Sequence, residues 1–259
     1  SKMADEGLSF ETALSLAQKE GFAEPDPTFD ISGQDAAQKT CILAILSFFK
    51  HVVIEKVHYE GIDNISPQDI DYGKQLQLVL KPLSIGMSKN NKFTLGSFPA
   101  FVKEKSLLAS IQNESNAVLM NTESTGGTMY AGPGAGAKPT SNSVLTDIID
   151  IARGKIFDYQ EFVKTSLDAS FEDFSCGHYL RMEVSDEAGV IAKISTVMAE
   201  NGLSIDNLIQ KELDKKEDVI PLVIVTSNSE EKVIQKVISD LRELSEVKNS
   251  ISHLRILDI

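Results

Sequence analysis

The sequence predicts an α+β protein with two domains, in which a mixed-sheet domain is followed by a ferredoxin-like βαββαβ domain. Its 259 residues exceed what one hydrophobic core usually holds, so we expect two cores. Between residues 52 and 128, short β-prone runs alternate with polar turns, and few helices intervene. From residue 178 onward, strand and helix periods follow one another in the order β-α-β-β-α-β.

The composition argues against several classes of protein, among them nucleic-acid-binding, membrane-bound and disulfide-rich secreted proteins. The chain has 25 Lys and Arg against 38 Asp and Glu, and this net charge of −13 argues against nucleic acid or an anionic membrane as a partner. Cys41 and Cys176 lie too far apart to form a disulfide framework. The longest apolar stretch, 41–49, is about half of a bilayer span, and the N-terminus has no signal-peptide pattern. We therefore expect a cytoplasmic protein.

The N-terminal part begins with helices. Residues 1–20 have helical spacing, with Ser9 able to cap the helix and Gly21 able to end it. Prolines keep 22–30 extended, because they exclude a helix there. Residues 32–35 then resemble a capping box that opens a helix reaching Phe49.

Strands are expected next. The β-prone runs cover 52–54, 77–80, 93–95 and 117–120. A loop of small residues at 131–140 and a helix over 143–156 follow. Residues 157–176 have no clear period and are the best linker candidate.

The C-terminal part has the clearest pattern. Strands are predicted over 178–184, 203–210, 219–226 and 251–257, and helices over 190–201 and from Ser229 to Leu244. Gly202 can end the first of these helices, and Ser229 can cap the second.

One charged cluster invites two interpretations. Its members are Glu24, Asp26, Asp30, Asp35 and Lys39, on a proline-stiffened loop and the helix after it. The ordinary interpretation is a cap and a surface ion pair between Asp35 and Lys39, worth about 0.3–0.5 kcal/mol. The same carboxylates would also bind an ammonium-bearing substrate, with the lysine handling a proton. Spacing alone leaves both interpretations open.

Other motifs carry no chemistry in our interpretation. The pattern Gly132-x-Gly134-x-x-Ala137 imitates a dinucleotide fingerprint, but no strand is predicted for the second half of a βαβ unit. It is better explained as a tight loop. The four histidines have no ligand spacing with one another or with cysteine, so we expect no metal site.

The charged cluster belongs to a longer motif. Residues 21–39, GFAEPDPTFDISGQDAAQK, resemble the homoserine dehydrogenase signature G-[YF]-x-E-x-D-P-x-x-D-x-x-G-x-D-x-x-x-K at every charged position and both glycines. Supporting matches follow in order at 60–62, 65, 116–118, 132–136 and 139–140. The C-terminal part resembles an ACT domain, with its turn at 186–190 and a second motif at 201–205.

This resemblance implies a domain division. Residues 1–156 would be the catalytic domain, which binds substrate and dimerises, 157–176 a linker, and 177–259 the ACT regulatory domain. In this family a Rossmann domain precedes the region, and Ser1 to Met3 resemble the end of the family segment N-G-T-T-N-[YF]-I-L-x-x-M. We therefore expect a C-terminal part that lacks most of the coenzyme site, is inactive alone and binds neither NADP nor NAD stably. Residues 140–144 depart from the family, which more often has smaller residues there.

The resemblance also implies roles for single residues. The family reduces L-aspartate 4-semialdehyde to L-homoserine with NADPH or NADH. Glu24 and Asp35 would hold the substrate ammonium, Asp30 would help to order the site, and Lys39 would give a proton to the aldehyde oxygen. Gly134 and Ala135 would lie near the coenzyme.

The ACT resemblance implies an effector site. Backbone N–H groups at Asp186, Gly189 and Val190 would receive a carboxylate, and Asn207 and Gln210 would meet the amino or hydroxyl group. For Asp186, an N-cap is an equally good interpretation. ACT domains usually pair edge to edge, so a homodimer or homotetramer is implied, with threonine as the expected effector. The alternative function is an amino-acid-binding regulatory protein with its ACT domain on a non-catalytic scaffold.

Overall fold

The computed structural model describes residues 1–89, 92–134, 136–155, 163, 165–210 and 218–259. Its helices are α1 Lys2–Glu6, α2 Phe10–Lys19, α3 Thr28–Ile31, α4 Gln34–Phe48, α5 Pro67–Gln75, α6 Ala137–Ala152, α8 Val190–Glu200 and α9 Glu231–Arg242. Short 3₁₀ turns cover Ile54–Lys56 and Leu107–Ser110. The strands are β1 Lys50–His51, β2 His58–Tyr59, β3 Leu78–Lys89, β4 Lys92–Lys103, β5 Ser115–Thr122, β6 Gly126–Pro133, β7 Thr165–Ser166, β8 Ser175–Ser185, β9 Ile205–Gln210, β10 Val219–Glu230 and β11 Ser252–Leu257.

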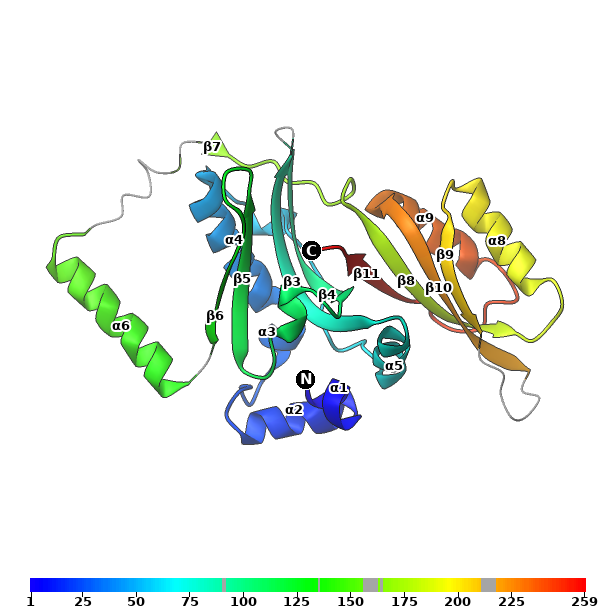
Figure 1. The fold of residues 1–259 in the computed structure, drawn as a ribbon, viewed down its shortest axis with the longest axis horizontal. Coiled ribbons are helices and arrows are strands. Elements are labelled where there is room, and N and C mark those ends of the chain that lie inside the picture. Colours follow the sequence, from blue (N-terminus) through cyan, green and yellow to red (C-terminus); the bar gives the residue numbers. More distant parts are fainter. Residues whose placement is uncertain (90–91, 135, 156–162, 164, 211–217) are drawn as a thin grey trace.

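One seven-stranded sheet runs through both parts of the molecule (Figure 1). Its order is β2-β4-β11-β8-β10-β9, and β3 pairs with β4 along its whole length. The junction is the parallel pairing of β11 with β4, in which Arg255 lies opposite Ala100. Because of this junction, the C-terminal unit is built onto the N-terminal sheet by backbone hydrogen bonds.

The C-terminal unit is the predicted βαββαβ fold. Helices α8 and α9 contribute Ile194 and Ile234 to a core that includes Leu180 and Leu222 from β8 and β10. All four side chains are completely buried. This arrangement confirms the predicted α+β class and the ferredoxin-like order of elements.

Several helix ends differ from the sequence prediction. Ser9 does cap α2 by accepting a hydrogen bond from the Thr12 backbone N–H, but Gly7, at φ 67°, separates α1 from α2. The capping box predicted at 32–35 is wrong, because the N-cap is Gly33, with φ 82° and no side-chain bond. Ser32 instead donates its hydroxyl to the Phe29 carbonyl.

Other predicted elements also shift. The strand predicted at 52–54 is wrong, since Ile54 begins a 3₁₀ turn. The loop predicted at 131–140 ends β6 and begins α6, which covers Ala137–Ala152 and not 143–156. Ser229 does not cap α9. The N-cap there is Glu230, and the buried Ser229 hydroxyl has no partner among the described residues.

The segment taken as a linker contributes to packing where the structure describes it. Leu167 and Phe174 are buried, and β7 pairs with β1. The Phe171 ring stacks on His58, with centroids 4.1 Å apart. The proposed domain boundaries stay a prediction. Among the helices the structure describes, none is long and apolar enough to cross a membrane.

Candidate functional site

The charged segment connects α2 to α4. The Gln18 side-chain amide donates to the Glu24 and Pro25 carbonyls, at 3.1 and 3.2 Å, and so fixes the path of the chain after α2. Asp26 then accepts bonds from the hydroxyl and backbone N–H of Thr28 at the start of α3, and these bonds lower the pKa of Asp26.

Of the four residues predicted to form the substrate site, two contact each other in the structure. Lys39 Nζ lies 2.5 Å from Asp35 Oδ2, one turn apart on α4, and the lysine side chain is 68% exposed. Glu24 lies among the turns and bends before α3, and Asp30 lies on α3; both are exposed. The prediction that 22–30 is extended is wrong, because its last residues begin α3 directly after Pro27. Within the described part of the chain, the Glu24 and Asp30 carboxylates make no hydrogen bond or ion pair. The structure therefore shows the Asp35–Lys39 pair, to which the solvent-exposed carboxylates of Glu24 and Asp30 do not bond.

The turn before α4 is held by a close backbone contact. A Cβ atom on Gly33 would lie 2.5 Å from the Glu60 carbonyl oxygen, and one on Gly61 would lie 2.6 Å from the Ile31 carbonyl oxygen. The Ile62 N–H donates to the same Ile31 carbonyl at 2.9 Å. Segment 60–62 therefore supports the turn at 31–33. That turn leads into α4, on which Asp35 and Lys39 lie. The match at 60–62 was visible in the sequence, but this supporting role was not.

A buried charge network continues from that segment. Arg255, on β11, is completely buried and donates to both oxygens of Glu60 at 2.8 and 2.9 Å. It also donates to both oxygens of Glu231, the first residue of α9, at 2.7 and 2.9 Å. Burial opposes these charges, but the hydrogen bonds outweigh it: they raise the pKa of Arg255 and, together with the bond from His58, hold the pKa of Glu60 at about 2.

Sequence reasoning missed Arg255. The signal that could have identified it is a cation between Leu254 and Ile256 in a strand predicted to close the core. A buried arginine needs paired carboxylates. Spacing could not name them, since Glu60 is 195 positions away in the sequence.

The structure describes one of the two residues predicted to lie near the coenzyme. Gly134 ends the β5–β6 hairpin, where its N–H donates to the Glu114 carbonyl at 2.9 Å. A Cβ atom there would lie 2.0 Å from the side-chain nitrogen of Asn116, so the neighbouring side chain accounts for this glycine. Ala135 lies outside the described residues. The contact of Gly134 and Ala135 with the coenzyme stays a prediction.

The predicted effector residues lie around one end of the C-terminal sheet. Gly189, at φ 96°, is the N-cap of α8, so the N-cap interpretation of Asp186 is wrong. Asp186 is exposed, whereas the Val190 side chain is buried in the core. Gln210 pairs with Leu222 and Ser185 with Val219, both near the start of β10, so the end of β9 lies at the same end of the sheet as the turn. Asn207 lies further along β9, opposite Val225.

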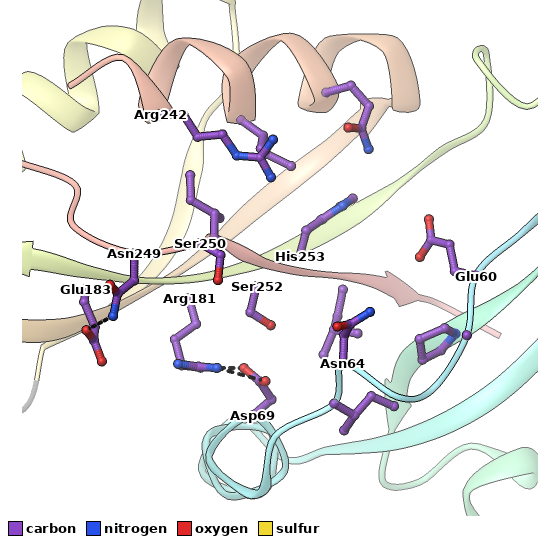
Figure 2. A pocket seen from close by; sticks show the side chains of 17 residues that line it. Glu60, Asn64, Asp69, Arg181, Glu183, Arg242, Asn249, Ser250, Ser252 and His253 are labelled. Carbon is purple, nitrogen blue, oxygen red and sulfur yellow. Dashed lines mark hydrogen bonds and ion pairs between the residues drawn. The ribbon is translucent and has the colours of Figure 1, made fainter. Parts of the chain in front are cut away.

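One cavity in the described structure lies away from these residues. It has about 630 Å³ and lies between the two parts, lined by Asn64 and Asp69 on one side and by Arg242 and His253 on the other (Figure 2). None of the predicted site residues lines it. No group of three or more His, Cys, Asp or Glu in the described ranges could hold a metal ion.

Comparisons with known proteins agree with this architecture. The family model for homoserine dehydrogenase matches residues 1–149, and the ACT domain model matches 178–246. A homoserine dehydrogenase of Pseudomonas aeruginosa is 32% identical over 266 residues, which cover 99% of this chain and 61% of the relative. That of Bacillus subtilis is 33% identical, covering 98% and 60%.

Solved structures give the same result. A homoserine dehydrogenase from Thiobacillus denitrificans matches with a TM-score of 0.90 and 30% identity, over 100% of this chain and 61% of that one. The enzyme from S. aureus at pH 6.5 matches with a TM-score of 0.73 and 26% identity, over the same shares. The chain thus spans about three fifths of the length of the curated relatives it matches. This chain belongs to the homoserine dehydrogenase family and carries an ACT domain.

Proposed function

We propose that this chain supplies the substrate-binding and regulatory parts of a homoserine dehydrogenase, which reduces L-aspartate 4-semialdehyde to L-homoserine in the biosynthesis of threonine, methionine and isoleucine. The supporting observation is the Asp35–Lys39 pair at the start of α4, on a turn fixed by segment 60–62. NADPH or NADH, bound by the complete protein, supplies the hydride.

The residues of this chain bind the substrate and handle a proton. The carboxylates of Glu24, Asp30 and Asp35 attract the substrate ammonium and orient the aldehyde toward Lys39. The Lys39 ammonium donates a proton to the aldehyde oxygen as negative charge develops there. Because the attraction is strongest when that charge is largest, it stabilises the transition state more than the bound substrate.

Substitution of Lys39 tests the proposal in the complete protein. We expect Lys39→Ala to lower kcat by about 10²- to 10⁴-fold, the usual contribution of a positioned proton donor, with little change in KM. Lys56→Ala is the matched control, because Lys56 forms a comparably exposed ion pair, with Asp168 at 2.8 Å. A rise in KM with unchanged kcat would refute the proton-donor role.

The 259 residues alone are expected not to catalyse the reaction. Because the family resemblance implies a separate coenzyme-binding domain, assays of this chain with NADPH and the aldehyde should give no turnover. Turnover by the chain alone would place the coenzyme within it and contradict our assignment.

The alternative is an amino-acid-binding regulatory protein whose scaffold has lost its chemistry. The retained Asp35–Lys39 pair favours the enzyme. If the complete protein binds amino acids but reduces no aldehyde, the alternative holds.

The ACT domain is proposed to sense threonine and to pair with a second copy. In the described sheet, the outer edge of β11 is already hydrogen-bonded to β4. The other edge strand of the C-terminal unit, β9, is therefore the one left for edge-to-edge pairing. Calorimetric titration with L-threonine, compared with L-isoleucine, L-methionine and L-lysine, should show saturable binding of threonine only. Sedimentation should show a homodimer or homotetramer, and a monomer at every concentration would contradict the pairing.

A further inference from the structure

Arg255 joins three elements that the sequence keeps apart. It lies on the last strand of the ACT domain, and its guanidinium bridges Glu231 on α9 and Glu60 after β2. Phe98 and Phe171 lie against it, with ring centroids 4.5 and 5.0 Å from the guanidinium carbon. Two carboxylates and two aromatic rings leave this side chain a single position.

Glu60 links Arg255 to the candidate substrate site, because it contacts both Arg255 and Gly33. Its side chain is fixed by Arg255 and by His58, whose Nε2 lies 2.7 Å from Glu60 Oε1. Its carbonyl oxygen occupies the space that a side chain at Gly33 would need. The backbone of 60–62 therefore cannot move far without moving the turn at 31–33.

That turn sets the directions of the charged residues. Asp30 precedes it on α3, and Asp35 and Lys39 follow it on the first turns of α4. Arg255 touches none of the three, so its effect reaches them only through segment 60–62.

We propose that Arg255 is a positioning residue for the substrate site, so that the last strand of the ACT domain holds the ammonium-binding carboxylates in register through Glu60. The proposal rests on the proposed function for its kinetic consequence. Its structural consequence, that loss of Arg255 loosens the 31–33 turn, does not depend on it.

The molecule contains a matched control. Arg181 on β8 forms a second buried ion pair between the two parts, with its Nε 2.6 Å from Asp69 Oδ1 on α5. Asp69 is completely buried and also accepts from the Tyr179 hydroxyl at 3.0 Å. Figure 2 shows this pair on the α5 side of the cavity, with Glu60 at the other end of the loop that leads past Asn64 into α5. Arg181→Met thus removes a comparable bridge, whose hydrogen bonds go to Ser66, Gln68 and Asp69 and not to the 31–33 turn.

The first experiment is steady-state kinetics of the complete protein. We expect Arg255→Met to raise KM for the aldehyde about tenfold and to lower kcat, because the carboxylates and Lys39 both follow the turn, while KM for the coenzyme stays within about twofold. Arg181→Met should leave all three constants within about twofold. Glu60→Gln, which keeps the side-chain shape, should raise KM in the same sense, and Arg255→Lys should recover part of the loss. Equal changes in Arg255→Met and Arg181→Met would overturn the proposal.

The second experiment needs no activity and uses the 259-residue chain. Backbone amides of residues 31–37 should exchange hydrogen at least several-fold faster in Arg255→Met than in Arg181→Met. Equal exchange in the two variants would overturn the proposal. An inactive wild-type protein that still shows the difference in exchange would refute the proposed function and leave the positioning of the turn intact.

Discussion

A buried histidine, His178, and its partly exposed neighbour His253 make the stability of this fold depend on pH. His178 Nε2 lies 3.3 Å from the Ser229 carbonyl and must carry the proton of that hydrogen bond. Its Nδ1 therefore accepts from His253 Nε2, 3.1 Å away. Burial lowers the pKa of His178 to about 4 and that of His253 to about 3, so both rings are neutral in the folded protein at neutral pH.

The free energy of unfolding should fall as the pH is lowered from about 6.5 to about 4. In this window the unfolded histidines bind protons and the folded ones do not, which stabilises the unfolded chain. Glu60 causes a second loss of stability between about pH 4.5 and 2, because its pKa of about 2 in the folded protein lies below its pKa in the unfolded chain. Urea unfolding across these pH values measures both.

His253→Gln separates the two windows. The variant keeps a side-chain donor for His178 but removes one titrating ring, so the loss of stability between pH 6.5 and 4 should shrink while the loss below pH 4.5 persists. An unchanged dependence in the upper window would show that the histidines do not cause it.

Prediction of single residues from the sequence succeeded where partners are close in the chain. The spacing of Asp35 and Lys39 on one helix predicts their ion pair directly. Arg255 could not be assigned partners, since its carboxylates lie 24 and 195 positions away. The caps at Ser32 and Ser229 failed because each backbone path places the N-cap one position later, at Gly33 and Glu230.

Helices α6 and α9 have contrasting environments despite similar apolar content. Helix α9 buries Ile234, Val237 and Leu241, whereas α6 buries none of its residues and exposes Val144, Ile148 and Ile151. Figure 1 shows α6 standing apart from the sheet. An isolated helix of this length is marginally stable in water, because little packing offsets the entropy of ordering it.

Amide hydrogen exchange should therefore distinguish the two helices in this chain. At low protein concentration, amides of α6 should exchange at least about a hundredfold faster than those of α9, which open only with the core. Equal protection would mean that another surface covers α6. A dilution series would then show whether that surface is a second copy, because its protection would fall on dilution.

The strand predictions show why the sheet was underestimated. Strand β4 covers twelve residues, of which the sequence pattern indicated only 93–95. Nearly all of its second half is buried, so its side chains do not alternate between polar and apolar. Where one face of a strand is partly exposed, as for Arg181 and Glu183 on β8, alternation was visible and the prediction of 178–184 falls within the observed Ser175–Ser185.

The two halves of the molecule should unfold together. Backbone pairing of β11 with β4 makes one sheet of them, and two buried ion pairs, Arg255 with Glu60 and Arg181 with Asp69, cross the junction. Separating the halves would leave Arg255 bound only to Glu231 and would expose the β4 and β11 edges. Breaking a fully buried pair by removing a partner costs about 3–5 kcal/mol, and the partial exposure of Glu60 and Arg181 makes the cost of breaking these pairs smaller.

Differential scanning calorimetry of this chain should accordingly show one transition whose calorimetric and van't Hoff enthalpies agree. Glu60→Gln should lower the midpoint of that single transition, because a neutral amide holds Arg255 less strongly. Two transitions, with only the first shifted by Glu60→Gln, would show that the ACT domain melts independently. In that case the junction would be too weak to hold the substrate turn, and the role assigned to Arg255 would fail with it.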